Sequence, residues 1–302
     1  MTWQDEAISL RKEGVSIRET SRKLDVPYST LWDFPQRCQK DGESSKEYFP
    51  KIGVFDVESA PFLSYAWKRW KENLSQDQIV KEGYLLTAAY KELGNPLVHT
   101  CNLLEAENDY PVVETVHKFL DDFDIVAGQN VKKFDLPLIN SRAVYHNFKP
   151  YSPVKVIDTL EIAKKVFKFP SNSLKSLAIY LGCTQKIENE GFNLWKKVMA
   201  GDTEALETML EYNIGDVTTT EEVFLKLRPW WPYGQNLNAY FNDGALRCPC
   251  CGSKHVVESD GIAVTSQSAF ATYVCEDCGK HMRGKSNLRS KESMSSTVLN
   301  IV

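Results

Sequence analysis

The sequence predicts three parts: an α/β core domain, a small all-α module before it and a small β module after it. Three observations predict this arrangement. Strand and helix patterns alternate through residues 50–228, which is typical of an α/β domain. Residues 1–40 carry apolar side chains at helical spacing. Two Cys-x-x-C pairs with strand-forming residues between them lie in residues 245–285, and the Ser-rich residues 286–302 are expected to form a loosely ordered tail.

The composition is that of an ordinary soluble globular protein, with 42% hydrophobic and 25% charged residues. No apolar stretch approaches membrane-spanning length, and Met1–Leu10 lacks the basic flank and apolar run of a signal peptide. We therefore expect no membrane partner and a cytoplasmic location, which is the host cytoplasm if the chain is viral. The net charge of −4 combines an acidic middle with slightly basic ends. This pattern is compatible with an acidic metal site and a polyanionic substrate, and equally with ordinary solvated surfaces.

The first module, residues 3–36, has the pattern of two or three short helices. A capping box begins the second helix at Ser16, and a third helix begins near Tyr28. This order resembles the helix-turn-helix of transposase and resolvase DNA-binding domains, which implies a helix facing the major groove. Pro35 ends that helix early, and a plain helical cap or a protein-docking module remains the alternative. The side chains that would open toward DNA are Tyr28, Ser29, Thr30 and Asp33.

The core domain follows a charged linker that begins near residue 40. Its predicted strands are 51–58, part of 79–88, 125–128 and 154–157. Its predicted helices are 112–123, 135–145, 160–167, 174–181, 203–212 and 217–227. Residues 228–244 form an irregular connector that is rich in aromatic residues and proline.

Two carboxylates lie at the end of the first predicted strand. Asp56 and Glu58 are two residues apart, so both side chains point to the same face. Burying paired charges without partners costs roughly several kcal/mol, and a divalent cation is the usual remedy. Exposed strands often carry such a pair too, so Asp-x-Glu alone does not predict a metal site.

Two further acidic residues lie on predicted helices. Asp135 follows a buried-type strand and begins a helix, where a simple N-cap is the first interpretation. Tyr212 and Asp216 are four residues apart, which places the hydroxyl and the carboxylate on one helix face, one turn apart. Taken alone, Asp216 is interpreted as an exposed helix acid.

In their order along the chain, these motifs resemble those of the proofreading-type 3′→5′ exonucleases, the DEDD superfamily. The motifs are Asp-x-Glu on a first strand, Asn-x-x-x-Phe-Asp from Asn130, and Tyr-x-x-x-Asp on a late helix. The tyrosine of the last motif corresponds to the tyrosine branch. The resemblance covers about residues 50–228 and implies a ribonuclease H-like fold, a mixed sheet flanked by helices. Ser59 keeps a small hydroxyl where the family often has threonine.

The resemblance also implies a role for each carboxylate. Asp56, Glu58 and Asp216 would hold one of two Mg²⁺ or Mn²⁺ ions, and Asp135 would help to place the second. Hard oxygen ligands suit these ions rather than zinc. Two such ions about 4 Å apart activate a water molecule and stabilise the leaving oxygen. Tyr212 would orient that water, because a phenol is a poor base but a good hydrogen-bond partner.

Contacts to the substrate are less determined by the sequence. Asn130 and Phe134 would position the substrate's 3′ end, although a loop amide and a core aromatic are equally good interpretations. Asp158 is interpreted as a helix N-cap. Five aromatic residues follow the first motif; most are expected in the core, with some available to stack on bases: Tyr65, Trp67, Trp70, Tyr84 and Tyr90.

The cysteine pattern near the C-terminus is typical of a structural zinc ribbon rather than of disulfides or a redox site. The two Cys-x-x-C knuckles supply four thiolates for one Zn²⁺, which leaves no open coordination position: Cys248, Cys251, Cys275 and Cys278. Cys250 would then be a spare thiol, and the alternative ligands are His255 and His281.

The ribbon resembles those of transposases and other DNA-handling proteins, which makes its basic residues candidate nucleic-acid contacts. These residues are Lys280, Arg283 and Lys285. Gly279–Ser286 also matches the letters of a phosphate-binding P-loop. No long apolar helix follows it, so we reject an ATPase.

The sequence therefore predicts a metal-dependent 3′→5′ exonuclease. Its expected partner is nucleic acid, with DNA favoured over RNA because of the two flanking modules. An enzyme of the same fold that trims RNA 3′ ends or acts as a structure-specific endonuclease is the first alternative. A DNA-binding adaptor with an inactive core is the second, and the complete set of four carboxylates argues against it.

Overall fold

The computed structural model describes residues 3–12, 15, 17–26, 49–103, 105, 107–184, 190–241 and 243–299. The chain divides into two compact units. The first comprises Met1–Ser45 and Pro50–Leu227, and the second comprises Lys46–Phe49 and Arg228–Val302. Among the described residues, no helix is long and apolar enough to cross a membrane.

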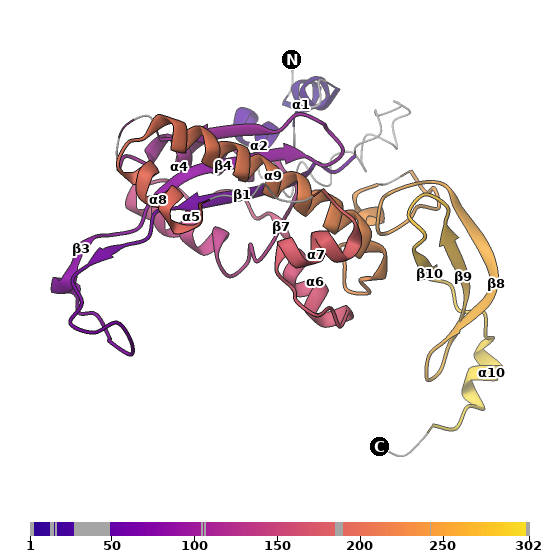
Figure 1. Cartoon of the computed structure of the whole chain (residues 1–302). Coiled ribbons are helices and arrows are strands. Elements are labelled where there is room, and N and C mark those ends of the chain that lie inside the picture. Colours follow the sequence, from indigo (N-terminus) through magenta and orange to yellow (C-terminus); the bar gives the residue numbers. More distant parts are fainter. Residues whose placement is uncertain are drawn as a thin grey trace. The chain divides into compact units, whose positions relative to one another are not determined.

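The first unit is built around a five-stranded mixed sheet (Figure 1). Its strands are β1 (Ile52–Ser59), β4 (Leu85–Glu92), β5 (His99–Asn102), β6 (Ile125–Gly128) and β7 (Lys155–Asp158), in the order β5-β4-β1-β6-β7. The pairs β1–β4 and β4–β5 are antiparallel, and the pairs β1–β6 and β6–β7 are parallel. The mixed sheet predicted from the sequence is confirmed, although β5 carried no recognisable pattern.

In the described part of the first unit, six helices follow β5 along the chain. They are α4 (Tyr110–Asp122), α5 (Asp135–Tyr145), α6 (Thr159–Val166), α7 (Leu174–Leu181), α8 (Phe192–Met199) and α9 (Thr203–Leu227). Helix α8 was not predicted. The prediction of two late helices, 203–212 and 217–227, was wrong, because α9 is continuous over 25 residues. Its buried side chains continue at helical spacing through Met209, Asn213 and Val217, and this packing outweighs the helix-weakening effect of Gly215.

The alternation of side chains along β1 separates the core from the site. Phe55 and Val57 face α4 and are buried with its apolar residues, such as Phe119. A Cβ atom on Gly53 would lie 2.4 Å from the Phe119 ring, so β1 and α4 approach closely here. The intervening residues, Asp56 and Glu58, therefore face the opposite side of the sheet.

The N-terminal residues of the first unit include two short helices, α1 (Trp3–Lys12) and α2 (Ile17–Leu24). Arg22 of α2 forms an ion pair with Asp121 of α4, at 3.0 Å. The predicted third helix, including Tyr28, lies outside the described residues, as does Ser16. The helix-turn-helix therefore stays a prediction.

A narrow arm, residues 61–82, extends from the end of β1 (Figure 1). It contains β2 (Leu63–Ser64), a 3₁₀ turn η2 (Gln76–Gln78) and β3 (Ile79–Lys81), with β2 and β3 paired antiparallel. The expectation that most aromatic residues after the first motif are core residues was wrong. Tyr84 is buried and Tyr90 is partly buried, but the other three, Tyr65, Trp67 and Trp70, are exposed on the arm because they lie outside the sheet.

The second unit is a small antiparallel β module. Two 3₁₀ turns, η3 (Arg228–Trp230) and η4 (Leu237–Tyr240), are followed by β8 (Val256–Val264), β9 (Ala269–Cys275) and β10 (His281–Arg283), in the order β10-β9-β8. Only β8 and β9 were predicted. The tail contains a short helix, α10 (Lys291–Ser295), capped by Ser290. The expectation that residues 286–302 are loosely ordered stays a prediction.

Candidate active site

Three of the four predicted carboxylates come together on the side of the sheet that faces α9. Asp56 and Glu58 of β1 and Asp216 of α9 each offer an oxygen, and these oxygens all lie within 4.8 Å of one another. Asp216 is buried, and the other two are half-buried. An all-oxygen group of this size fits a hard divalent cation and has no sulfur or imidazole ligand that would favour zinc.

An asparagine that the sequence analysis did not single out holds one of these carboxylates. The side-chain amide of Asn213 donates to Asp56 Oδ2 at 2.7 Å, and Thr87 Oγ1 donates to Asn213 Oδ1 at 3.2 Å. Asn213 and Thr87 are fully buried. This chain of hydrogen bonds fixes the orientation of the Asp56 carboxylate. The sequence could have pointed to Asn213, because it lies three residues before Asp216 and therefore shares its helix face.

The fourth carboxylate, Asp135, is the first residue of α5 and is almost fully buried. Its Oδ1 accepts a hydrogen bond from the Val57 N–H at 3.3 Å. Val57 is the residue between Asp56 and Glu58 on β1, so Asp135 contacts the backbone of β1 at these two acids. Burial, followed by the nearby charge of Asp158, raises the pKa of Asp135 to about 7. The helix N-cap is Phe134, so the N-cap interpretation of Asp135 was wrong.

Tyr212 lies one turn before Asp216 on α9 and is half-buried. Its ring meets the Trp195 ring of α8 edge to face, with a centroid separation of 6.3 Å. This contact restricts the directions in which the phenol can point.

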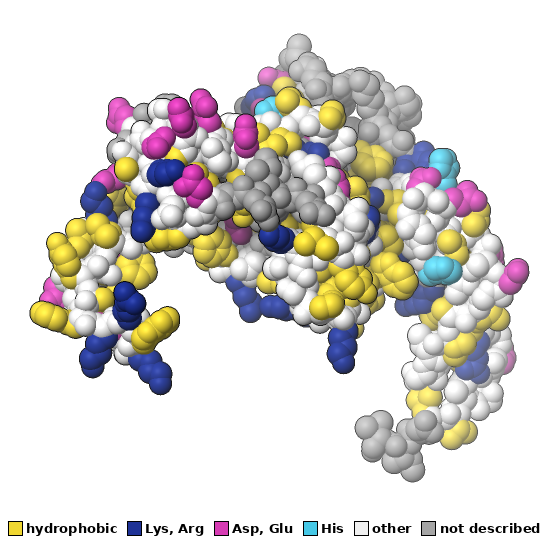
Figure 2. Space-filling view, viewed as in Figure 1, with side chains coloured by type: hydrophobic (Ala, Val, Ile, Leu, Met, Phe, Trp, Pro, Cys, Tyr) yellow, Lys and Arg dark blue, Asp and Glu magenta, His cyan; other side chains and the backbone are white. Residues whose placement is uncertain are grey.

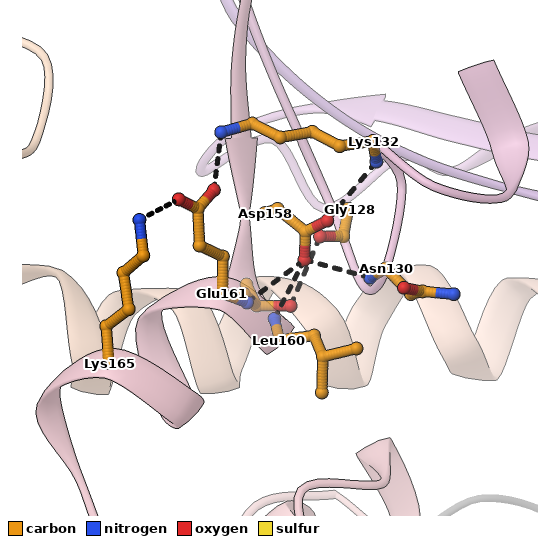
Figure 3. A network of polar contacts seen from close by, with 8 residues as sticks. Gly128, Asn130, Lys132, Asp158, Leu160, Glu161 and Lys165 are labelled. Atoms are coloured by element: carbon orange, nitrogen blue, oxygen red, sulfur yellow. Dashed lines mark hydrogen bonds and ion pairs between the residues drawn. The ribbon is translucent and has the colours of Figure 1, made fainter. Parts of the chain in front are cut away.

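The loop between β6 and α5 is held by Asp158 (Figure 3). The carboxylate of Asp158 caps α6 by accepting from the N–H groups of Leu160 and Glu161, as predicted for an N-cap. It also accepts from the N–H groups of Asn130 and Lys132, at 3.0 and 3.2 Å. Asn130 adopts a left-handed conformation with φ of 62°, which a turn stabilised in this way tolerates.

The loop leads to Phe134, whose side chain is half exposed. The alternative interpretation of Phe134 as a core aromatic is therefore wrong. The side chain of Asn130 is half-buried. The loop thus presents one exposed ring next to the buried Asp135, whereas the backbone of Asn130 supplies the turn.

The second unit holds a separate group of possible metal ligands. Sulfur atoms of Cys248, Cys251, Cys275 and Cys278 lie within 4.8 Å of one another. The Cys248–Cys278 and Cys251–Cys275 sulfur pairs are each 3.6 Å apart. A hydrogen bond from the Cys248 thiol lowers the pKa of Cys251 to about 5, and burial raises the pKa of Cys278 to about 12. Four thiolates this close repel one another unless a cation neutralises them, so the cluster fits a thiophilic metal ion.

The other candidate ligands of this unit are not in the group. Cys250 is not among the four clustered sulfurs, although its N–H lies 3.4 Å from the Cys248 sulfur. His255 Nδ1 is 3.0 Å from Asp277 Oδ1, and the hydrogen bond with Asp277 raises the pKa of His255. His281 lies exposed on β10.

The central strand of the mixed sheet and helix α9 thus bring together oxygen ligands of the kind that a divalent cation prefers. Residues 73–228, just over half of the chain, match the model of the RNase_H superfamily. The chain belongs to this superfamily. The matched segment contains Asp135, Tyr212 and Asp216 but begins after Asp56 and Glu58. Membership supports a nuclease with a nucleic-acid substrate.

The chain is also similar in structure to the family B DNA polymerase from the hyperthermophilic archaeon Pyrobaculum calidifontis. The TM-score is 0.47 and the sequence identity is 15%; the similarity covers 66% of this chain and 28% of the polymerase chain. The chain thus spans just over a quarter of the polymerase's length. A comparison with curated proteins gives no match.

Proposed function

We propose that the chain is a metal-dependent 3′→5′ exonuclease that hydrolyses the phosphodiester bonds of DNA. The observation that supports this most directly is the convergence of Asp56, Glu58 and Asp216, with ligand oxygens within 4.8 Å of one another. Asp135 adds a fourth carboxylate against the backbone of the same strand. Acids in such a buried arrangement cost free energy unless they hold a cation, which favours a functional explanation.

Each residue of the site has a distinct proposed role. Asp56, Glu58 and Asp216 would bind one Mg²⁺ or Mn²⁺ ion, and Asp135 would take part in holding a second. Two such ions supply Lewis acidity for an in-line attack by water on phosphorus. Asn213 keeps the Asp56 carboxylate pointing toward the other ligands. Tyr212, restrained by Trp195, would hold the attacking water by a hydrogen bond.

The direction of cutting depends on how the end of a strand is held. Phe134 presents an exposed ring on the loop that leads to Asp135, where it would pack against the terminal nucleotide. Asn130 would contribute from the same loop, which Asp158 fixes in place. A terminal base packed in this way leaves the last phosphodiester bond at the carboxylates, which is the arrangement that an exonuclease needs.

The second unit would bind one structural Zn²⁺ through its four clustered cysteines and would contact DNA. Two of the proposed contacts already have partners within the unit. Lys280 donates to the Trp231 carbonyl at 2.8 Å, and the Arg283 guanidinium lies 4.0 Å from the centre of the Phe270 ring. Lys285 is exposed and is the most accessible of the three proposed contacts.

One assay separates this function from the alternatives. We would incubate 5′-labelled single-stranded DNA, duplex DNA and RNA with Mg²⁺ or Mn²⁺, using wild type and Asp56→Ala. We expect a ladder of DNA products that shortens from the 3′ end with the wild type and not with the variant. A ladder confined to RNA indicates RNA trimming, and internal cuts indicate an endonuclease. DNA binding without metal-dependent cleavage by the wild type indicates an adaptor and overturns the proposal.

A further inference from the structure

The arm, residues 61–82, carries three large aromatic side chains that are almost fully exposed. The exposed fraction is 77% for Tyr65, 92% for Trp67 and 81% for Trp70. A tryptophan or tyrosine ring buries about 150–250 Å² in a typical contact, so leaving three of them in water forgoes several kcal/mol, roughly. Exposed apolar groups concentrated in this way mark an interaction surface.

Basic side chains lie among these rings. Lys68, Arg69 and Lys71 are exposed, and the stretch Ser64–Lys71 contains no carboxylate. In the described part of the chain, none of the three cations forms an ion pair. Hydrophobic and basic side chains accordingly gather on the arm, at the left of Figure 2. A partner suited to this surface has flat apolar faces and repeated negative charges.

The tip of the arm is ordered by its own hydrogen bonds. The Glu72 carboxylate accepts from the N–H groups of Trp67 and Lys68 and from the side-chain amide of Gln78. Gln78 is in turn bonded to Tyr65 through both its backbone and its side chain. These bonds fix the backbone that carries Tyr65 and Trp67 before any partner arrives, which lowers the entropy cost of binding.

The base of the arm is also fixed, and it adjoins the carboxylates. The Ala60 N–H donates to the Tyr84 carbonyl at 2.8 Å, and both residues are buried. A Cβ atom on Gly83 would lie 2.9 Å from the Ala60 carbonyl oxygen, so the two chain segments meet closely. Only Ser59 and Ala60 separate Glu58 from the arm. The base of the arm is thus joined to the strand that carries Asp56 and Glu58 of the proposed reaction site.

We propose that the arm binds a single-stranded segment of the nucleic-acid substrate. Bases stack on Tyr65, Trp67 and Trp70, and phosphates lie near Lys68, Arg69 and Lys71. Single strands meet the chemistry of the surface, because unpaired bases offer π faces between phosphates, whereas a duplex keeps its bases stacked inside. This inference rests on the proposed nuclease function and adds the strandedness of its substrate.

The first test measures binding without cleavage, in buffer free of Mg²⁺ and Mn²⁺. Fluorescein-labelled single-stranded DNA, single-stranded RNA and duplex DNA are titrated with wild type and with a Trp67→Ala/Trp70→Ala variant. We expect the variant to lose roughly ten-fold or more in affinity for single strands, since each stacked base contributes on that scale. Duplex affinity should change little. A comparison of the single-stranded DNA and single-stranded RNA titrations shows which nucleic acid is preferred.

Three controls accompany this test. Trp67→Phe/Trp70→Phe keeps two flat rings and should restore most of the affinity. Tyr180→Ala removes an exposed ring from α7, outside the arm, and should leave affinity unchanged. The thermal midpoints of the arm variants should equal that of the wild type, because the replaced rings are in water.

The second test concerns charge. Replacing Lys68, Arg69 and Lys71 by glutamine should lower the slope of log Kd against log salt by up to about 2, at about 0.7 for each phosphate that is no longer neutralised. The proposal is overturned if the double tryptophan variant binds single strands like the wild type. It is also overturned if the arm variants lose affinity for anionic lipid vesicles but not for nucleic acid. Because this test measures binding and not cleavage, its result does not depend on whether the proposed nuclease activity is correct.

Discussion

At the scale of single residues, Asn213 should control how well the site binds its metal. Replacing Asn213 with leucine removes the donor to Asp56 Oδ2 and leaves Thr87 without its acceptor. We expect the Mg²⁺ concentration that gives half-maximal cleavage to rise by roughly ten- to a hundred-fold, as is usual when a group that orients a metal ligand is removed. Cleavage at saturating Mg²⁺ should fall less. The measurement is a Mg²⁺ titration of the cleavage rate.

Two further variants test this explanation. Thr87→Val removes only the outer hydrogen bond and should give a smaller rise in the Mg²⁺ requirement. Asn193→Leu changes an exposed asparagine of α8 and should give none. An Asn213→Leu protein with the Mg²⁺ requirement of the wild type would show that Asp56 is held by other contacts.

The buried carboxyl of Asp135 should make stability depend on pH. Its pKa is raised from 3.8 to about 7 in the folded protein, so the folded state binds the proton more tightly than the unfolded state. Stability is therefore lost as the pH rises from about 4 toward about 7. Asp135→Asn keeps an acceptor for the Val57 N–H and avoids this loss. In metal-free buffer, the variant's thermal midpoint should exceed that of the wild type by a margin that grows over this range.

Added Mg²⁺ provides the counter-test. If Asp135 helps to hold an ion, Mg²⁺ should stabilise the wild type more than Asp135→Asn and narrow the margin above pH about 7. A margin that is independent of pH would mean that the Asp135 carboxyl is already ionised at low pH.

Residue types and spacing were enough to predict part of this site. Spacing predicted that Asp56 and Glu58 share a face of a strand and that Tyr212 and Asp216 share a face of a helix. That the strand and the helix would bring Asp56, Glu58 and Asp216 together was implied only by the resemblance to the proofreading-type exonucleases. The side-chain direction of Asp135 could not be predicted. An aspartate at a helix start usually caps it, but this one accepts a hydrogen bond from the Val57 N–H of the neighbouring strand, a tertiary contact that the local sequence does not specify.

At the scale of elements, replacing two different glycines with alanine should have opposite effects on stability. Gly215 lies inside α9 with no atom within 4 Å of an added Cβ. Gly215→Ala should therefore raise the free energy of unfolding by about 0.5–1 kcal/mol, because alanine loses less backbone entropy in a helix. Gly53→Ala should destabilise, since its Cβ would overlap the Phe119 ring. Denaturant unfolding of both variants measures the two effects, and a loss of stability in Gly215→Ala would contradict the open space around it.

These elements also show where prediction from sequence ends. The strands β1, β6 and β7 are short apolar runs bounded by polar turns, and they were predicted close to their true bounds. The edge strand β5 (His99–Asn102) has exposed positions and no alternation, because it is stabilised by pairing with β4 rather than by its own pattern. The arm was missed because its sequence is as rich in aromatic residues as a core segment. Its rings are nevertheless exposed on the surface.

At the scale of the whole molecule, the division into two compact units predicts two separable unfolding transitions. A cysteine cluster that binds zinc would contribute on the order of 10 kcal/mol to the second unit, and the first unit has a large apolar core of its own. Cys275→Ser replaces a fully buried member of the cluster. It should abolish bound zinc and the transition of the second unit, and it should leave the other transition at the wild-type temperature. Atomic absorption and calorimetry measure these outcomes.

The matched control is Cys250→Ser, because Cys250 lies between the two cysteines of its knuckle but outside the four-sulfur group. It should retain one zinc per chain and both transitions. Equal zinc loss from both variants would show that Cys250 is a zinc ligand and would contradict the proposed set of four. If Cys275→Ser instead shifts both transitions, the two units do not unfold independently. The cysteine module would then contribute to the stability of the first unit as well as to its own.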